Sequence, residues 1–298
     1  ALNQAGVRAA YLNSSLTPRQ FALALENARQ GLYRVIYVAP ERLETPAFQD
    51  LCREIAVPLV AVDEAHCVSQ WGQDFRPSYL RIRDFVESLP ARPVLGAFTA
   101  TATPEVRDDI RDLLGLQDPF CVATGFDRPN LRFAVENVPQ REKTNALLRL
   151  LREQKGRSGI VYCLARRTVE EVCEALRARG IAATRYHAGL SDAERRQNQD
   201  DFLYDRAEVM VATNAFGMGI DKSNVAFVIH YNMPKNLESY YQEAGRAGRD
   251  GSNAVCTLLY SGQDVRLNAF LIEKEEENPL LTEEQARAVR DGLREGLR

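Results

Sequence analysis

The chain of 298 residues is long enough for about two domains, and its 45% hydrophobic and 27% charged residues are typical of an ordinary folded protein. Its formal net charge of −3 argues against binding nucleic acid by bulk electrostatic attraction, so any such binding must use local basic patches. No apolar run reaches the ~18–20 residues that a membrane-spanning helix needs, and the N-terminal residues lack a secretory pattern, so we expect a cytoplasmic protein.

The first part of the chain alternates predicted helices with predicted strands. Thr17 and Gln20 match a capping box, with Pro18 at the first helical position, which predicts a helix to about residue 30. Strands are predicted at residues 33–38, 58–62 and 93–98, and a further helix at residues 80–87. This alternation predicts a βαβ architecture with a parallel sheet, in which the apolar residues 58–62 form a strand buried on both faces.

Two carboxylates, Asp63 and Glu64, directly follow this apolar strand. In open α/β sheets, ligands bind beyond the carboxyl ends of the strands, where catalytic groups are usually mounted. Mg²⁺ prefers carboxylate oxygen and keeps several waters, so one carboxylate can hold Mg²⁺ through water while its neighbour orients an attacking water. The pair therefore indicates nucleotide hydrolysis. The alternative for an isolated Asp-Glu pair is a helix cap with first-turn charge.

The next segment, residues 71–77, alternates aromatic residues and a cation with polar residues. Trp71, Phe75 and Arg76 suit stacking on unpaired bases, which is worth about 1–3 kcal/mol per base. The alternative for the two aromatic residues is burial in the core, but the flanking Gly, Asp, Arg and Pro argue against a buried helix or strand.

A threonine-rich turn follows the strand at residues 93–98. Thr103 precedes Pro104 and is the expected helix cap. Thr99 and Thr101 are then left to bond the neighbouring carboxylates.

Turn residues at 125–130 interrupt the pattern, and we expect the domain boundary there. A second α/β series follows, with strands predicted at residues 132–138, 159–164, 208–213 and 225–230 and helices at residues 142–154, 168–179 and 191–204. Gly180 closes one of these helices as a C-cap. Gly217 and Gly219 lie near a strand end, where exposed backbone N–H groups can bind phosphate, although a lone Gly-x-Gly is more often a turn.

A glycine-rich segment at residues 240–251 carries Arg246 and Arg249, which would face nearly the same way if the segment were helical. The planar fork of arginine matches phosphate oxygens, and an arginine from outside the P-loop stabilises transition-state charge, worth on the order of 10³–10⁵ in rate. The alternative is a solvated basic helix, but the glycines make the segment a poor helix former.

The six cysteines are scattered along the chain and form no Cys-x-x-Cys pair. We therefore expect reduced, buried thiols, without a disulfide framework and without a zinc site. The residues are Cys52, Cys67, Cys121, Cys163, Cys173 and Cys256.

Together these segments resemble the RecQ family of ATP-dependent DNA helicases, in superfamily 2. The resemblance extends from residue 12 to about residue 260, and its most specific blocks are a DEAH box with the aromatic loop at 63–77, and residues 126–130, 186–190, 212–221 and 240–251. It implies an α/β fold of two RecA-like parallel-sheet lobes, with ATP between them and single-stranded DNA across their top. The implied divisions are lobe 1 at residues 1–125, lobe 2 at residues 126–270, and the helical start of a further region at residues 271–298.

The resemblance also implies roles for individual residues. Asp63 would hold Mg²⁺ through water and Glu64 would be the catalytic base. One arginine of the glycine-rich segment would act as the finger. The residues implied to couple the ATP site to DNA or to sense DNA are His66, Gln70, Trp71, Phe75, Arg76, Thr99 and Thr101. Those implied near the nucleotide are Asp221 at the sugar and Gln242, Arg246 and Arg249 at the phosphates.

The implied activity is ATP-driven 3′ to 5′ translocation on single-stranded DNA with unwinding of partly duplex DNA, in repair and recombination. The implied cofactors are ATP and Mg²⁺. The sequence contains neither a Gly-x-x-x-x-Gly-Lys-Ser/Thr loop nor the family's four-cysteine zinc module and winged helix. We therefore interpret the chain as a fragment whose first lobe is truncated at its N-terminus and is less stable than the second. The alternatives are a catalytically incompetent module that binds single-stranded nucleic acid, and an RNA helicase of the same superfamily.

Overall fold

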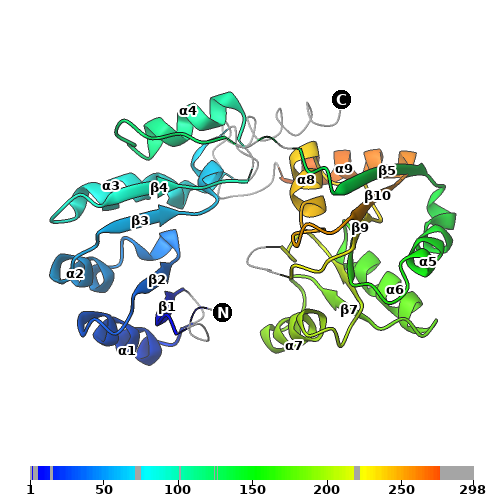
Figure 1. Ribbon diagram of the computed structural model, residues 1–298, viewed down its shortest axis with the longest axis horizontal. Helices are drawn as coiled ribbons and strands as arrows, with labels where there is room; N and C mark the ends of the chain where they lie inside the picture. Colours follow the sequence, from blue (N-terminus) through cyan, green and yellow to red (C-terminus); the bar gives the residue numbers. More distant parts are fainter. Residues whose placement is uncertain are drawn as a thin grey trace. The chain divides into compact units, whose positions relative to one another are not determined.

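The computed structural model describes residues 2, 6–13, 16–70, 75–100, 102–123, 125, 127–217 and 222–275 (Figure 1). The chain divides into two compact units, Ala1–Val122 and Ala123–Arg298. Among the described residues, no helix combines the length and the apolar character needed to span a membrane. Of the residues to which we assigned roles, Trp71, Thr101 and Asp221 lie outside the described part, as do residues 276–298 of the expected C-terminal region.

The first unit contains two parallel strand pairs. Its strands are β1 (Ala9–Leu12), paired with β2 (Val35–Val38), and β3 (Leu59–Val62), paired with β4 (Val94–Ala97). Its helices are α1 (Pro18–Arg29), α2 (Pro46–Glu54), α3 (Arg81–Ser88) and α4 (Pro104–Leu113), with short 3₁₀ turns at Ala65–Val68 and Pro77–Leu80. Helices and strands pack around one apolar core that includes Leu12, Leu51, Val62 and Val86.

Local capping determines where these helices begin. The Thr17 hydroxyl accepts the Gln20 N–H at 3.3 Å and the Gln20 side chain accepts the Thr17 N–H at 2.9 Å, so the predicted capping box is confirmed. Thr103 likewise caps α4 by accepting the Val106 N–H at 3.3 Å. Helix α2 follows the same Thr-Pro pattern, at Thr45 and Pro46, although no helix was predicted there.

The expectation that the strand at 58–62 is buried on both faces is wrong. Leu59 is 59% exposed, and in this strand only Val62 is buried. In the described structure β3 pairs with β4 alone, so its side chains have one neighbouring strand and cover on one face only. Val94, the β4 residue opposite Leu59, is 70% exposed for the same reason.

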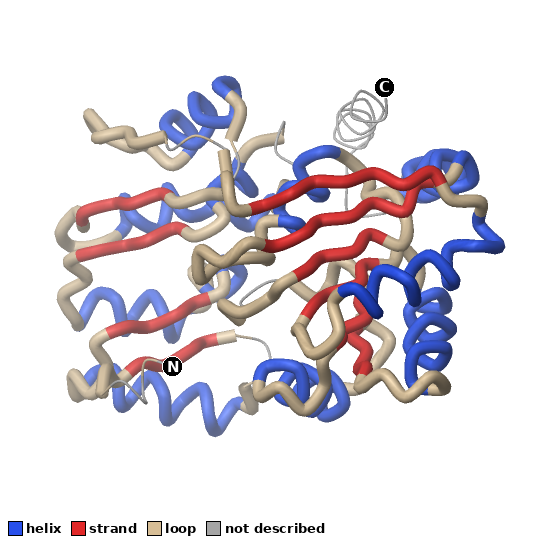
Figure 2. Tube along the Cα trace, turned by 45° about the vertical axis from the view of Figure 1, so that its right-hand side comes forward, coloured by secondary structure: helices blue, strands red, loops and turns tan. Residues whose placement is uncertain are grey.

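The second unit is a six-stranded parallel sheet in the order β5-β10-β9-β6-β8-β7 (Figure 2). Its strands are β5 (Leu131–Asn137), β6 (Gly159–Tyr162), β7 (Ala183–Tyr186), β8 (Val209–Ala212), β9 (Phe227–His230) and β10 (Ala254–Tyr260). Its helices are α5 (Lys143–Glu153), α6 (Arg166–Arg177), α7 (Asp192–Leu203), α8 (Leu237–Ala244) and α9 (Gly262–Glu275).

Helices cover both faces of this sheet. Successive strand residues point to opposite faces, so they pack against different helices. Val161 packs in the cluster that contains the apolar residues of α5 and α6, whereas Ile160 and Tyr162 pack in the cluster that contains Phe202 of α7 and Ala244 of α8. The four residues of β6, β8 and β9 are all buried. This is the pattern expected of central strands in a doubly wound sheet, whose carboxyl ends carry the ligand-binding groups.

Candidate functional site

The first group of candidate residues lies at the carboxyl end of β3. Phe98 N–H donates to Val62 O at 2.8 Å and Ala65 N–H donates to Phe98 O at 2.9 Å, which ties the end of β3 to the end of β4. Between these bonds, Glu64 adopts the left-handed conformation, with φ 48°. A non-glycine residue there costs about 1–3 kcal/mol and persists where the surrounding structure demands it, often at functional sites. The turn places two adjacent carboxylates at the ligand-binding edge.

The carboxylates of Asp63 and Glu64 differ in environment. Asp63 is exposed, and its Oδ1 accepts the Glu64 N–H at 3.0 Å. Glu64 Oε2 is buried without a hydrogen-bond partner in the described part of the chain, 3.5 Å from His66 Nδ1. Buried acceptors are normally satisfied, so such an atom is typical of a group whose partner is a water or a ligand.

These two carboxylates fit a magnesium ion held largely by water and substrate. Mg²⁺ usually binds one or two carboxylates together with substrate phosphates, rather than a complete protein cage. Among the described residues, no three His, Cys, Asp or Glu side chains gather as a metal-binding group. The hard oxygens of Asp63 and Glu64 are therefore suitable for a water-mediated ion and unsuitable for a dry, fully protein-bound one.

His66 connects this turn to the end of β4. It is buried, and its Nδ1 lies 2.8 Å from Thr99 Oγ1. The structure thus brings together three residues that the sequence analysis singled out: Glu64, His66 and Thr99. Gln70 is exposed and takes no part in the contact between His66 and Thr99. It is the last described residue before residue 75.

Residues 76 and 79, which follow the 3₁₀ turn Ala65–Val68, form hydrogen bonds with the carboxylate turn at the end of β3. Arg76 N–H donates to Cys67 O at 2.9 Å, and the Tyr79 hydroxyl donates to Asp63 O at 3.2 Å. Burial, as the largest cause, raises the pKa of Tyr79 to about 12, so the phenol stays protonated and remains a donor. Phe75 and Arg76 are half-buried where the loop rejoins the unit. These two bonds hold residues 76–79 beside the carboxylate turn.

In the second unit, the glycine-rich segment that carries Arg246 and Arg249 is not helical, so the condition under which the two arginines would share a face does not hold. Helix α8 ends at Ala244, and both arginines lie in the following turns. Arg246 is half-buried, and its Nη1 donates to Gly217 O at 2.6 Å. A Cβ at Gly217 would lie 2.4 Å from Arg246 Nη2, so a larger residue there would displace the guanidinium. Arg249 is exposed, and Gln242 is half-buried on α8.

Buried polar residues that the sequence analysis missed support this region from the sheet. The Tyr162 hydroxyl donates to Phe216 O at 2.8 Å, and burial raises the pKa of Tyr162. His230 Nε2 lies 2.9 Å from Glu243 Oε2, and the His230 ring stacks on Tyr162 with centroids 5.5 Å apart. These residues sit within apolar strands and a helix, so their sequence surroundings suggested only packing.

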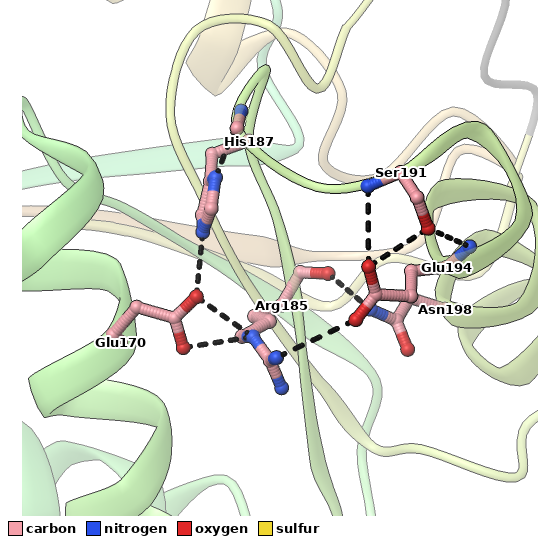
Figure 3. A network of polar contacts seen from close by, with 7 residues as sticks. Glu170, Arg185, His187, Ser191, Glu194 and Asn198 are labelled. Carbon is pink, nitrogen blue, oxygen red and sulfur yellow. Dashed lines mark hydrogen bonds and ion pairs between the residues drawn. The ribbon is translucent and has the colours of Figure 1, made fainter.

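The segment after β7, within the block at residues 186–190, is held by a polar network (Figure 3). Glu170 lies between His187 and Arg185, with His187 Nε2 2.7 Å from Glu170 Oε1 and Arg185 Nε 2.7 Å from Glu170 Oε2. Gly189 N–H donates to His187 Nδ1 at 3.1 Å, so Nε2 carries the proton that faces Glu170. Burial alone would raise the pKa of Glu170, but the bonds from His187 and Arg185 lower it overall.

Two family models match the chain. The DEAD/DEAH box helicase model matches residues 3–110, and the helicase conserved C-terminal domain model matches residues 142–251. These matches fall on the two units separately, and they cover the carboxylates of the first and the arginines of the second.

Curated relatives are similar over most of the chain. The ATP-dependent DNA helicase RecQ of Bacillus subtilis (strain 168) is 48% identical over 276 residues, which are 93% of this chain and 46% of the relative. The protein of the same name from Pasteurella multocida (strain Pm70) is 44% identical over 272 residues, 91% of this chain and 43% of the relative. The chain therefore spans a little under half the length of these relatives.

Solved helicase structures share the fold at low sequence identity. Dbp5 of S. cerevisiae, bound to RNA and ADP BeF3, matches with a TM-score of 0.66 and 19% identity over 98% of this chain and 74% of that one. Helicase Lhr of Mycobacterium smegmatis, bound to ssDNA and AMP-PNP, matches with a TM-score of 0.67 and 21% identity over 92% of this chain and 38% of that one. The expected α/β fold of RecA-like lobes is confirmed, and the chain belongs to the RecQ family of helicases.

Proposed function

We propose that the protein containing this chain is an ATP-dependent DNA helicase that moves 3′ to 5′ along single-stranded DNA and unwinds partly duplex DNA. Relatives that carry the name ATP-dependent DNA helicase RecQ align over more than nine-tenths of the chain and support this substrate class. The observation that carries the hydrolytic part is Glu64, whose buried Oε2 has no hydrogen-bond partner among the described residues. We also propose a cytoplasmic protein that acts in DNA repair and recombination.

Asp63 and Glu64 divide the chemistry in this proposal. Asp63 would hold Mg²⁺ through water, and the ion would supply positive charge that offsets the negative charge of the phosphates. Glu64 accepts a hydrogen bond from the attacking water and takes its proton. The water oxygen bonds to the γ-phosphorus as the bond from that phosphorus to the bridging oxygen breaks, and ADP leaves with the electron pair.

Arg249 is the arginine that we assign to the developing charge on the phosphates. Arg246 already donates to Gly217 O at 2.6 Å, so its guanidinium holds the chain after β8 in place. Arg249 follows in an exposed turn. The further assignments, Gln242 near the phosphates and Asp221 near the sugar, are part of the same proposal.

The proposed DNA sensor is the loop that contains Trp71 and ends at Phe75 and Arg76. The chain at and after its end is bonded to the carboxylate turn, because Arg76 N–H donates to Cys67 O and the Tyr79 hydroxyl donates to Asp63 O. A base that stacks in the loop is thus mechanically connected to the hydrolytic groups. The proposed coupling contact is that of His66 with Thr99, with Gln70 and Thr101 on the flanking segments.

The test is the variant Glu64→Gln in the protein expressed from its full reading frame. We expect wild-type ATP hydrolysis that single-stranded DNA stimulates, and a loss of about 10²–10⁴-fold in kcat for the variant. Binding of a fluorescent ATP analogue should be retained, because the amide keeps the shape of the carboxylate. The matched control is Glu87→Gln, on the exposed face of α3, which should keep wild-type turnover. Because the 298-residue chain contains no P-loop motif, we expect little hydrolysis from it alone.

Three outcomes would contradict the proposal. Single-stranded DNA binding without hydrolysis by the wild-type protein would identify a binding module. Stimulation by RNA and not by DNA would identify an RNA helicase. Full activity of Glu64→Gln would remove this residue from the chemistry.

A further inference from the structure

The turn that follows α8 leaves backbone carbonyls that need partners. Ala247 and Gly248 are buried in this turn, and buried backbone carbonyls are nearly always paired with a backbone group, a side chain or water. Here Gly245 is the C-cap of α8, and Gly248 adopts a left-handed conformation with φ 57°. A Cβ on Gly248 would lie 2.5 Å from Asn130 Nδ2 and 2.6 Å from Ser252 O, so the turn closes on a neighbouring segment at a distance that only glycine permits.

That neighbouring segment is the block Asp127-Arg128-Pro129-Asn130, more than a hundred residues earlier in the chain. Arg128 Nη2 donates to Ala247 O at 3.1 Å and to Gly248 O at 2.9 Å. Asn130 Nδ2 donates to Gly248 O at 2.9 Å and to Ser252 O at 2.9 Å. Arg128 Nη2 and Asn130 Nδ2 each carry two hydrogens, and each nitrogen donates to two carbonyls. Together they supply donors to the carbonyls of Ala247, Gly248 and Ser252.

These bonds fix the peptide that carries Arg249. Gly248 O belongs to the peptide group whose nitrogen is that of Arg249, and it accepts from both Arg128 and Asn130. On the other side of the same residue, Gly248 N–H donates to Val225 O at 2.8 Å, beside β9. Asn130 is itself fixed, because its carbonyl accepts the Ala254 N–H at 2.9 Å, where β10 begins. The direction in which Arg249 leaves the turn is therefore set by the sheet.

We propose that Arg128 and Asn130 are positioning residues for ATP hydrolysis, which hold the Gly248–Arg249 peptide so that the Arg249 guanidinium meets the phosphates. This inference rests on the proposed function. A long arginine side chain amplifies any rotation of its backbone, and a misplacement of about 1 Å at a reacting group can cost about 10²-fold in rate. Two planar groups that each bridge two carbonyls resist such a rotation, whereas a single hydrogen bond would leave it free.

The first experiment uses kinetics of the protein expressed from its full reading frame. Arg128→Met should lower kcat for ATP by about ten- to a hundredfold and leave KM within about threefold, because Arg128 does not bind the nucleotide. Asn130→Asp, which has the same shape but turns an acceptor toward two carbonyls, should do the same. Arg128→Lys should recover part of the loss. The control Arg132→Met removes the same charge from an exposed position on β5 and should keep wild-type kcat.

A double-mutant cycle separates positioning from general damage. In the background Arg249→Ala, the further change Arg128→Met should alter kcat by less than about twofold, because the group being positioned is already gone. Independent losses that multiply would overturn the proposal. So would wild-type kcat in both Arg128→Met and Asn130→Asp.

The second experiment needs no activity, so it distinguishes failure of this inference from failure of the proposed function. Hydrogen exchange of the 298-residue chain should show faster exchange at residues 246–252 in Arg128→Met, with exchange in β6 and β8 unchanged. Unchanged exchange at residues 246–252 would overturn the positioning role even if the wild-type protein hydrolyses ATP. Faster exchange at residues 246–252 in a protein without ATP hydrolysis would support the positioning role of Arg128 and reject only the helicase assignment.

Discussion

The contact between His66 and Thr99 lets one hydroxyl group be tested on its own. Thr99→Val keeps the shape of the side chain and removes the oxygen that lies 2.8 Å from His66 Nδ1. His66 is buried, so the loss leaves a polar nitrogen unsatisfied, which costs about 1–3 kcal/mol. We expect hydrolysis without DNA to stay near the wild-type value and stimulation by single-stranded DNA to fall by about tenfold, in titrations of ATP turnover against DNA concentration.

Thr103→Val is the matched control for this prediction. The same substitution, on the same turn, removes the cap of α4, so it should lower the melting temperature and leave DNA stimulation intact. Equal loss of stimulation in the two variants would mean that Thr99 acts through the stability of the turn.

Some residues of the candidate site could be predicted from the sequence and others could not. The position of Asp63 and Glu64 at the carboxyl end of a strand, where ligands bind, was predictable because an apolar strand precedes them directly. The inward position of Arg246 was not, because it depends on Gly217 O, which lies 29 residues away in the sequence and is brought close by the sheet. The roles of Arg128 and Asn130 were hidden for the same reason, although the block that contains them was recognised.

At the scale of elements, local signals predicted helix starts well and burial poorly. A capping residue lies directly beside the first turn of the helix that it begins, so Thr17 and Thr103 could be identified from the sequence. The burial of residues 58–62 depends on which strands lie beside them. Strand β10 was not predicted although residues 254–260 are largely apolar, and its place between β5 and β9 depends on segments far away in the sequence.

A buried ion pair connects two helices of the second unit. Lys143 Nζ, at the start of α5, lies 2.6 Å from Asp264 Oδ2 on α9 and donates to Tyr231 O at 2.7 Å. The carboxylate also accepts from Asn232 Nδ2 at 2.9 Å and from Ser261 N–H at 3.0 Å. Burial lowers the pKa of Lys143, and Asp264 opposes that shift. The four bonds fix the start of α9 against the ends of β9 and β10.

Asp264→Asn should destabilise this unit by about 3–5 kcal/mol, because it leaves a buried ammonium group without a counter-charge. Adding Lys143→Met should recover most of that loss by replacing the charge with an apolar side chain. Urea unfolding followed by circular dichroism measures both. Glu171→Gln, in the exposed pair with Arg167 on α6, is the control and should change stability by less than about 0.5 kcal/mol. Equal stability of Asp264→Asn and the wild type would show that the pair does not hold α9.

At the scale of the whole molecule, the two units bury their sheets to different degrees. The described part of the first unit has two separate strand pairs, and large apolar residues of these strands are exposed: Tyr11 55%, Tyr37 59%, Leu59 59% and Val94 70%. The second unit has one continuous sheet whose central strands are buried throughout. Since stability rises with the apolar surface removed from water, the first unit is expected to be the weaker.

We therefore expect the 298-residue chain to unfold in two steps. Hydrogen exchange at increasing urea concentration should first release the amides of β3 and β4, while those of β6, β8 and β9 stay protected until a second, higher midpoint. A variant that weakens only the second sheet should bring the midpoints together. Gly159→Ala is suitable, because its Cβ would meet the Phe227 ring at 2.2 Å and must displace it. Joint release of all five strands at one midpoint in the wild-type chain would mean that the units unfold as one, and the difference in burial would then not govern stability.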